Sequence, residues 1–211
     1  MRAKELNRPV LIEATANQVN QFGGYTGMKP ADFYQLVLKM AKEMGVPENH
    51  MILAGDHLGP LTWQNEPEEE AMAKSEELVY QYVRAGFTKI HLDTSMKLAD
   101  DPEGALATEI VAKRGVRLYQ VCMKAYEELK EEKPEAMRPV FIIGSEVPIP
   151  GGAQEAEDSL AVTKPEAFEE TVNTYKRCFA EAGVPDGWKD VIAVVVQPGV
   201  EFGDDQVFLY D

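Results

Sequence analysis

The chain has 211 residues, of which 45% are hydrophobic, and it carries a formal net charge of −15. That length and apolar content suffice for one globular domain with a substantial core. The acidic balance disfavours nucleic acid as a partner, because nucleic-acid recognition relies on Lys and Arg that neutralise phosphates. No apolar run approaches the roughly 20 residues that cross a bilayer. We therefore expect a cytoplasmic protein that binds neither nucleic acid nor membranes.

Short apolar runs alternate with helical patterns along the chain. The runs, each bounded by turn residues, predict strands at Val10–Ala14, Met51–Pro60, Phe87–Leu92, Pro139–Gly144 and Val191–Val196. Apolar residues at helical spacing predict helices at Pro30–Gly45, Glu66–Ala85, within Asp100–Lys133 and at Pro165–Ala182. Strands separated by long helices indicate βαβ units, and hence a parallel sheet with right-handed crossovers.

Two closures of such a sheet are compatible with this order of elements. A doubly wound sheet usually carries a G-x-G-x-x-G fingerprint after a strand, and the sequence has none. In a (β/α)8 barrel, polar residues gather at the carboxyl ends of the strands, which is the pattern of this sequence. Because a complete barrel takes about 250 residues, we expect an α/β fold that is a partial (β/α)8 TIM barrel of about five parallel strands. Residues 1–211 would form a single incomplete domain without the N-terminal strand and the C-terminal strands of a full barrel.

The second predicted strand, MILAGDHLGP, ends in Asp56 and His57. Neighbouring residues on a strand point to opposite faces, so both side chains can reach one site only if the backbone turns there. Gly55 and Gly59 permit such a turn. An acid and an imidazole at the end of a barrel strand predict an active site. The structural alternative is that Asp56 caps the next helix and that His57 is a surface or core residue.

Polar residues recur at or beyond the ends of the other predicted strands. These candidates are His91, Asp93, Ser95, Glu146 and Gln197. Glu13 lies inside the first strand. The polar, Gly-rich segment 17–28 that follows this strand contains Asn17 and Gln21, and we expect it to be a functional loop, with a structural loop as the alternative.

Five segments carry a resemblance to a known family: IEATANQVNQFGGYTGM, GDHLGPLTWQ, KIHLDTSM, IGSEVPIPGG and VVVQPGVEF. In this order they resemble the accessory, non-catalytic subunit of D-tagatose-1,6-bisphosphate aldolase, which is the partner chain of a class II aldolase in galactitol and N-acetylgalactosamine catabolism. The resemblance covers essentially the whole chain. It implies a TIM barrel in a chain longer than this one, and it implies the catalytic subunit of a class II tagatose-bisphosphate aldolase as the partner.

The resemblance also bears on chemistry, because class II aldolases place an Asp-His pair after an early strand. Asp56 and His57 match that pair as catalytic acid/base and zinc ligand. A neutral imidazole binds zinc well, a metal would polarise the carbonyl of a ketose, and the carboxylate would shuttle the proton. A catalytic zinc normally has three protein ligands, but the late strand VVVQPGVEF has no histidine, and His50 precedes its strand, at the opposite end of the barrel. Zinc or another divalent metal would therefore have an incomplete ligand set.

Three functions are compatible with the resemblance and the residues. The first is an accessory subunit required for full activity and stability of the aldolase. The second is a metal-dependent ketose or keto-sugar epimerase, and the third, which the missing histidine disfavours, is zinc-dependent aldol cleavage. In a catalytic site, Asp56 and Glu146 would be catalytic residues and His57 a metal ligand. Contacts to a sugar or sugar phosphate are assigned to Glu13, Asn17, Gln21, His91, Asp93, Ser95 and Gln197.

Four of these residues also have a structural interpretation. Glu13 bridges neighbouring strands in the alternative to substrate contact, and Asp93 caps the following loop. His91 alternates with Leu92 along its strand, so it faces either the barrel interior or the helices, and burial on the helix side would make it structural. Gln197 equally well satisfies backbone groups of its loop.

Overall fold

The computed structural model of the protein describes residues 2–104, 106–144, 163–197, 200–202 and 207–209. Its main sheet consists of five parallel strands whose spatial order follows the sequence. These strands are β1 (Val10–Thr15), β2 (Met51–Leu58), β3 (Lys89–Leu92), β4 (Val140–Ile143) and β5 (Val191–Val194). The short strands β6 (Val200–Phe202) and β7 (Val207–Leu209) form a separate antiparallel pair, which the sequence pattern did not predict.

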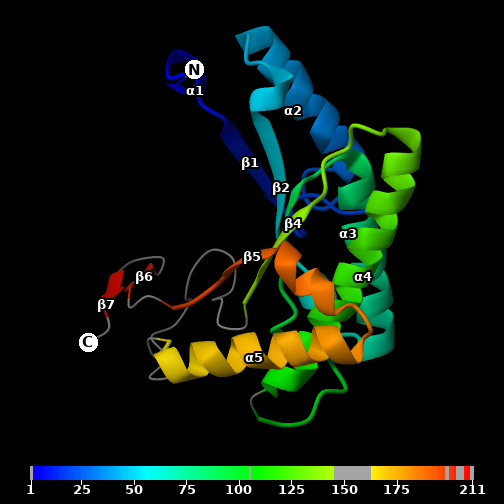
Figure 1. Ribbon diagram of the computed structural model, residues 1–211, viewed down its shortest axis with the longest axis vertical. Coiled ribbons are helices and arrows are strands. Elements are labelled where there is room, and N and C mark those ends of the chain that lie inside the picture. Colours follow the sequence, from blue (N-terminus) through cyan, green and yellow to red (C-terminus); the bar gives the residue numbers. More distant parts are fainter. Residues whose placement is uncertain (1, 105, 145–162, 198–199, 203–206, 210–211) are drawn as a thin grey trace.

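The four long helices lie on one side of the main sheet, and each falls between two consecutive strands (Figure 1). They are α2 (Pro30–Met44), α3 (Glu68–Ala85), α4 (Thr108–Glu132) and α5 (Pro165–Glu181). The shorter elements are α1 (Arg2–Glu5) and the 3-10 turns η1 (Glu48–His50), η2 (Pro60–Trp63) and η3 (Pro185–Asp190). No helix in the described ranges combines the length and apolarity needed to span a membrane.

The strand order distinguishes the two closures considered above. A doubly wound sheet reverses its direction of strand addition at a switch point, whereas a barrel adds each strand next to the previous one. The order β1-β2-β3-β4-β5 has no reversal. The prediction of an α/β, partial barrel-like fold with five parallel strands is therefore confirmed.

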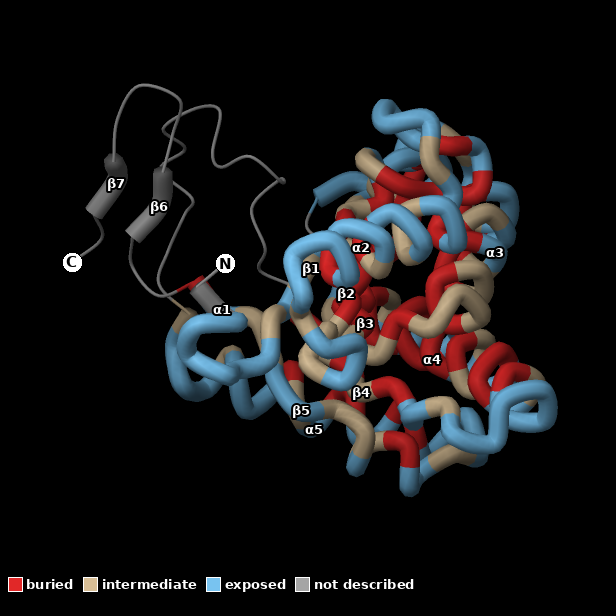
Figure 2. The backbone as a smooth tube through the Cα atoms, turned by 90° about the horizontal axis from the view of Figure 1, so that it is seen from above, coloured by how far each residue is buried: buried red, intermediate tan, exposed pale blue. Residues whose placement is uncertain are grey.

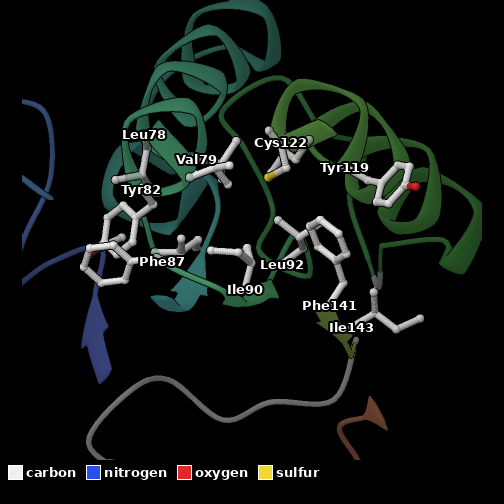
Figure 3. Close-up of a cluster of buried hydrophobic side chains, with 14 of the residues drawn as sticks. Leu78, Val79, Tyr82, Phe87, Ile90, Leu92, Tyr119, Cys122, Phe141 and Ile143 are labelled. Carbon is white, nitrogen blue, oxygen red and sulfur yellow. The ribbon is translucent and has the colours of Figure 1, made fainter. Parts of the chain in front are cut away.

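The core fills the layer between the sheet and helices α3 and α4 (Figures 2 and 3). Alternate strand residues enter this layer, among them Ile90 and Leu92 of β3 and Phe141 and Ile143 of β4, all almost fully buried. The Phe141 ring meets Tyr119 of α4 edge-on, with ring centroids 4.9 Å apart. This alternation is the period of two that a strand imposes on its side chains.

The remaining strand residues belong to the opposite face of the sheet, which we call the inner face. In the register of the sheet, Glu13 of β1 is aligned with Ala54 of β2, and Ala54 is aligned with Lys89 of β3. Two residues further along these strands, Thr15 of β1 is aligned with Asp56 of β2, and this pair lies on the same face. Charged side chains from three neighbouring strands therefore share this face.

Local signals explain the helix boundaries. Pro30 opens α2, where its missing N–H costs nothing. Gly45 ends α2 with φ of 66°, and its N–H reaches the carbonyls of Ala41 and Lys42. Gly86 ends α3 in the same left-handed region, with φ of 102°. These caps fix where the chain leaves each helix to enter the next strand.

Candidate metal and sugar site

Asp56 and His57 lie together at the carboxyl end of β2 because the backbone turns at His57. This residue has φ of 51°, an uncommon conformation for a non-glycine residue. The pairing of β2 with β3 shifts register between Gly55 and Leu58. As a result the adjacent side chains meet, with His57 Nδ1 2.9 Å from Asp56 Oδ2. The predicted turn is present, but it occurs at the histidine rather than at a flanking glycine.

Gly59 has a different role from the one the sequence suggested. Its φ of 171° is ordinary extended backbone. What it provides is close approach: a Cβ at this position would lie 1.7 Å from the carbonyl oxygen of Asp93. The same junction is held by a hydrogen bond from Asp93 N–H to Leu58 O, at 2.9 Å. Gly59 thus lets the end of β2 lie directly against the end of β3.

His91 of β3 joins the pair from the neighbouring strand. Its Nδ1 is 3.1 Å from Asp56 Oδ1, and its ring centroid is 4.9 Å from that of His57. Its strand neighbours Ile90 and Leu92 point into the helix-side core. His91 is therefore buried, but on the inner face rather than against the helices, which resolves the two orientations left open by the sequence.

The charges in this cluster reinforce one another. Burial alone would raise the pKa of Asp56, but hydrogen bonds from His57 and His91 outweigh burial and hold that pKa well below its usual range. Burial alone would lower the pKa of His57, but the hydrogen bond and charge of Asp56, with the charge of Asp93, raise it above the ordinary value. Asp56 is thus an ionised acceptor at neutral pH.

Lys89 is the residue of this cluster that the sequence analysis missed. Its ammonium forms an ion pair with Glu13 and lies 3.5 Å from Asp56 Oδ1. The signal was present in KIHLD, because Lys89 and His91 are two apart on a strand and must share a face. Glu13 thus bridges strands, as its structural alternative proposed.

Asp93 and Ser95 form a pair just beyond β3. The Ser95 hydroxyl and N–H both donate to Asp93 Oδ1, at 2.6 and 3.1 Å. The other carboxylate oxygen, Oδ2, is buried and has no hydrogen-bond partner among the residues the structure describes. Asp93 therefore shapes its own loop and also presents a free acceptor close enough to raise the pKa of His57.

The loop after β1 contributes less directly. Asn17 accepts a hydrogen bond from the Thr62 hydroxyl at 2.9 Å, so it lies at the same end of the sheet as the cluster. Gln21 instead donates to the carbonyl of Lys74 on α3, which directs its amide to the helix layer. The structure does not bring Gln21 to the cluster.

Gln197 and Glu146 are two further predicted site residues. Gln197 is buried after β5, where its backbone exchanges hydrogen bonds with Thr163: the Gln197 N–H donates to Thr163 Oγ1 at 2.8 Å, and the Thr163 N–H donates to Gln197 O at 3.1 Å. Glu146, predicted as catalytic, lies outside the described residues. The sugar contact assigned to Gln197 and the catalytic role assigned to Glu146 stay predictions.

The donor atoms of the cluster fit a divalent metal. One ligand atom each from Asp56, His57 and His91 lie within 4.8 Å of one another. Both Nε2 atoms are buried and lack a hydrogen-bond partner in the described part of the chain. Metal-binding histidines commonly ligate through one ring nitrogen while the other is held by a carboxylate, and imidazole with carboxylate suits zinc. The sequence has only three histidines, and His50 precedes β2 at the opposite end of that strand, so this site has at most two imidazoles.

A cavity of about 560 Å³ lies elsewhere, at the amino ends of β2 and β3. It is lined by Tyr34, Glu48, Met51 and Phe87, among others, and by no residue of the cluster. Barrel enzymes place their chemistry at the carboxyl ends of the strands. The polar cluster, rather than this cavity, is therefore the candidate functional site.

Comparisons with known proteins agree with the fold and with the resemblance. The family described as D-tagatose-1,6-bisphosphate aldolase subunit GatZ/KbaZ-like matches residues 1–211. The subunit GatZ of Salmonella gallinarum is 50% identical over 201 residues, which cover 95% of this chain and 46% of that protein. The corresponding subunit of Salmonella paratyphi B is 51% identical over the same coverage.

A solved structure extends the comparison to three dimensions. The crystal structure of a probable tagatose 6 phosphate kinase from Sinorhizobium meliloti 1021 superposes with a TM-score of 0.82 at 45% identity. The match covers 100% of this chain and 48% of that one, so the chain spans about half the length of the relatives it matches. With a match to the family over its whole length, the chain belongs to the D-tagatose-1,6-bisphosphate aldolase subunit GatZ/KbaZ-like family.

Proposed function

We propose that this protein is a cytoplasmic accessory subunit that raises the activity and stability of a class II D-tagatose-1,6-bisphosphate aldolase. The observation that carries the proposal is the family match over residues 1–211, together with relatives named as subunits of this aldolase. The partner is then the catalytic aldolase chain, and the pathway is the use of galactitol or N-acetylgalactosamine.

The geometry of the site favours this role over aldol cleavage by the chain itself. A catalytic zinc normally has three protein ligands and an open position. Here the sequence supplies two imidazoles at most, and both oxygens of Asp56 already face the Nδ1 atoms of those imidazoles. The residues of this sequence therefore do not by themselves supply three histidine ligands at this site.

The test is reconstitution with a class II tagatose-bisphosphate aldolase catalytic chain. Adding this protein should increase the rate of tagatose 1,6-bisphosphate cleavage and lengthen the half-life of that activity on warming. An equal mass of an unrelated acidic protein serves as the control. Equal rates and half-lives with and without this protein would contradict the accessory role.

A second candidate, a metal-dependent ketose or keto-sugar epimerase, is favoured by the paired imidazoles. The observation is that two buried Nε2 atoms lack protein partners among the described residues, and the centroids of their two imidazole rings are 4.9 Å apart. A divalent metal bound there would supply Lewis-acid polarisation of a ketose carbonyl. His57 and His91 would hold it, Asp56 would orient both rings, and Asp93 with Ser95 would offer acceptors and a hydroxyl to the sugar.

The epimerase candidate is tested by turnover without any partner chain. Tagatose 6-phosphate, tagatose 1,6-bisphosphate and free tagatose are incubated with the protein and zinc or manganese, and sugar products are separated. Epimerised product that disappears in Asp56→Asn and His57→Ala, but persists in His50→Ala at the other end of β2, would establish the enzyme. Absence of product with every sugar and metal would exclude it.

A further inference from the structure

Lys89 occupies the centre of a charge network that connects β1, β2 and β3. Its ammonium sits between the carboxylates of Glu13 on β1 and Asp56 on β2, and only 14% of its side chain is exposed. Glu13 reaches it across β2 because the residue between them in the register is the small Ala54. Neighbouring strands lie about 4.8 Å apart, so two long side chains are needed to span two strand spacings.

Both oxygens of the Asp56 carboxylate have partners in this network, and these contacts fix the orientation of the carboxylate. Oδ2 lies 2.9 Å from His57 Nδ1, while Oδ1 lies 3.1 Å from His91 Nδ1 and 3.5 Å from Lys89 Nζ. An ionised carboxylate only accepts hydrogen bonds, so each Nδ1 facing it carries the proton. The His57 N–H also approaches His91 Nδ1, but at the longer distance of 3.4 Å. We therefore assign both imidazoles the Nδ1–H tautomer, which leaves their buried Nε2 atoms as lone-pair donors.

We propose that Lys89, anchored by Glu13, is a positioning residue for a divalent-metal site at His57 and His91 and acts through Asp56. Its ammonium holds Oδ1 so that one carboxylate orients two imidazoles at once. The inference rests on the metal-binding alternative of the proposed function. It adds the requirement that metal affinity depends on a cation that never touches the metal.

The first test uses the metal-free protein. The chain has three histidines, so a long-range proton–nitrogen NMR spectrum of the imidazoles contains three sets of signals, and His50 is the internal reference. In the neutral state of the imidazoles, two sets should show the Nδ1–H tautomer in the wild type. Lys89→Met should convert at least one of them to the Nε2–H tautomer or a mixture, and Lys89→Arg should retain both. Unchanged tautomers in Lys89→Met would overturn the proposal.

The second test measures cobalt(II) affinity by absorption titration. Lys89→Met should bind about 10- to 100-fold more weakly than the wild type, the usual effect of removing a group that supports metal ligands. Lys89→Arg should recover most of the affinity. Glu13→Gln should weaken binding in the same direction but less, and it provides a milder variant if Lys89→Met does not fold.

Lys74→Met is the matched control, because it removes a lysine of α3 that pairs at 2.5 Å with Glu66, just before that helix and away from the cluster. Its cobalt affinity should equal that of the wild type. No cobalt binding by the wild type would remove the metal site and this proposal with it. Tight binding by the wild type and equal binding by Lys89→Met would leave the metal site intact and overturn the positioning role alone.

Discussion

On β3, Ile90 and Leu92 enter the packed layer beneath α3 and α4, whereas Lys89 and His91 point to the inner face and meet charged groups of β1 and β2. The helix side of the sheet is apolar and closely packed, and its residues are explained by core formation. The inner face instead carries an acid-imidazole-ammonium network whose buried nitrogens lack partners in the described chain. Buried polar groups are normally satisfied, so the unpartnered imidazole nitrogens of the inner face are candidates for binding a ligand.

The largest effect should come from the helix side. Phe141→Ala removes a fully buried ring that packs on Tyr119, and we expect a loss of about 3–5 kcal/mol in the free energy of unfolding. Urea unfolding followed by circular dichroism measures this. Ile142→Ala, the next residue on the opposite face, is only partly buried and should cost less than half as much. Equal losses at the two positions would show that the two faces do not differ as described.

The next effect tests a buried ion pair outside the inner face. Arg114 of α4 is 2% exposed and donates to both oxygens of Asp101, which lies in the loop after β3. Among the described residues, Asp101→Asn leaves that guanidinium with Glu68 alone as an ionised partner. Because breaking a buried pair strands a charge, we expect a loss of about 3 kcal/mol at pH 7.

The pH dependence of this loss follows from the pKa of Asp101. The hydrogen bond from Arg114 lowers that pKa below its ordinary value of 3.8. A lowered carboxyl pKa stabilises the fold fully above pH 3.8, and the contribution is lost as the pH falls through the folded-state value. The difference in the free energy of unfolding between wild type and Asp101→Asn should therefore be constant from about pH 7 to 5 and become smaller below about pH 4. A gap that widened in acid would contradict this sign.

The contact between the ends of β2 and β3, where the site lies, depends on Gly59. Gly59→Ala would place a Cβ against the carbonyl oxygen of Asp93, which is backbone and cannot rotate away. We expect a loss of about 1–3 kcal/mol, as for other overpacked sites, together with displaced imidazole signals of His57 and His91 in NMR spectra. Gly104→Ala gives a comparison in which steric overlap is absent. Nothing lies within 4 Å of the Cβ position of Gly104, and its φ is positive, so any loss of stability there comes from backbone strain. Unchanged imidazole signals in Gly59→Ala would show that this contact does not position the site.

The fold was predictable from the sequence because helix stop signals such as Gly45 and Gly86 and the apolar runs repeat at regular intervals. The family was predictable because long segments such as GDHLGPLTWQ are unusual and occur in order. The site was predictable only in part. Asp56 and His57 stood out in one motif, but their meeting depends on a positive φ at His57, and Lys89 was visible only through the alternation of β3. The contact of Gln21 with α3 was not visible in the sequence, because a polar side chain in a loop can be held by the backbone of a distant helix.

The smallest effect on stability should come from the inner face itself. Glu13→Gln removes the charge that pairs with Lys89, but the Glu13 side chain is 37% exposed. Pairs that water reaches contribute at most about 1 kcal/mol, so the loss in unfolding free energy should be well below that of Asp101→Asn in the same urea experiment. A loss as large as that of Asp101→Asn would mean that the inner-face network is part of the stabilising core. A small loss of stability combined with clearly weaker cobalt binding would instead show that these charges serve the site, because a purely structural ion pair would weaken cobalt binding only through its effect on the fold.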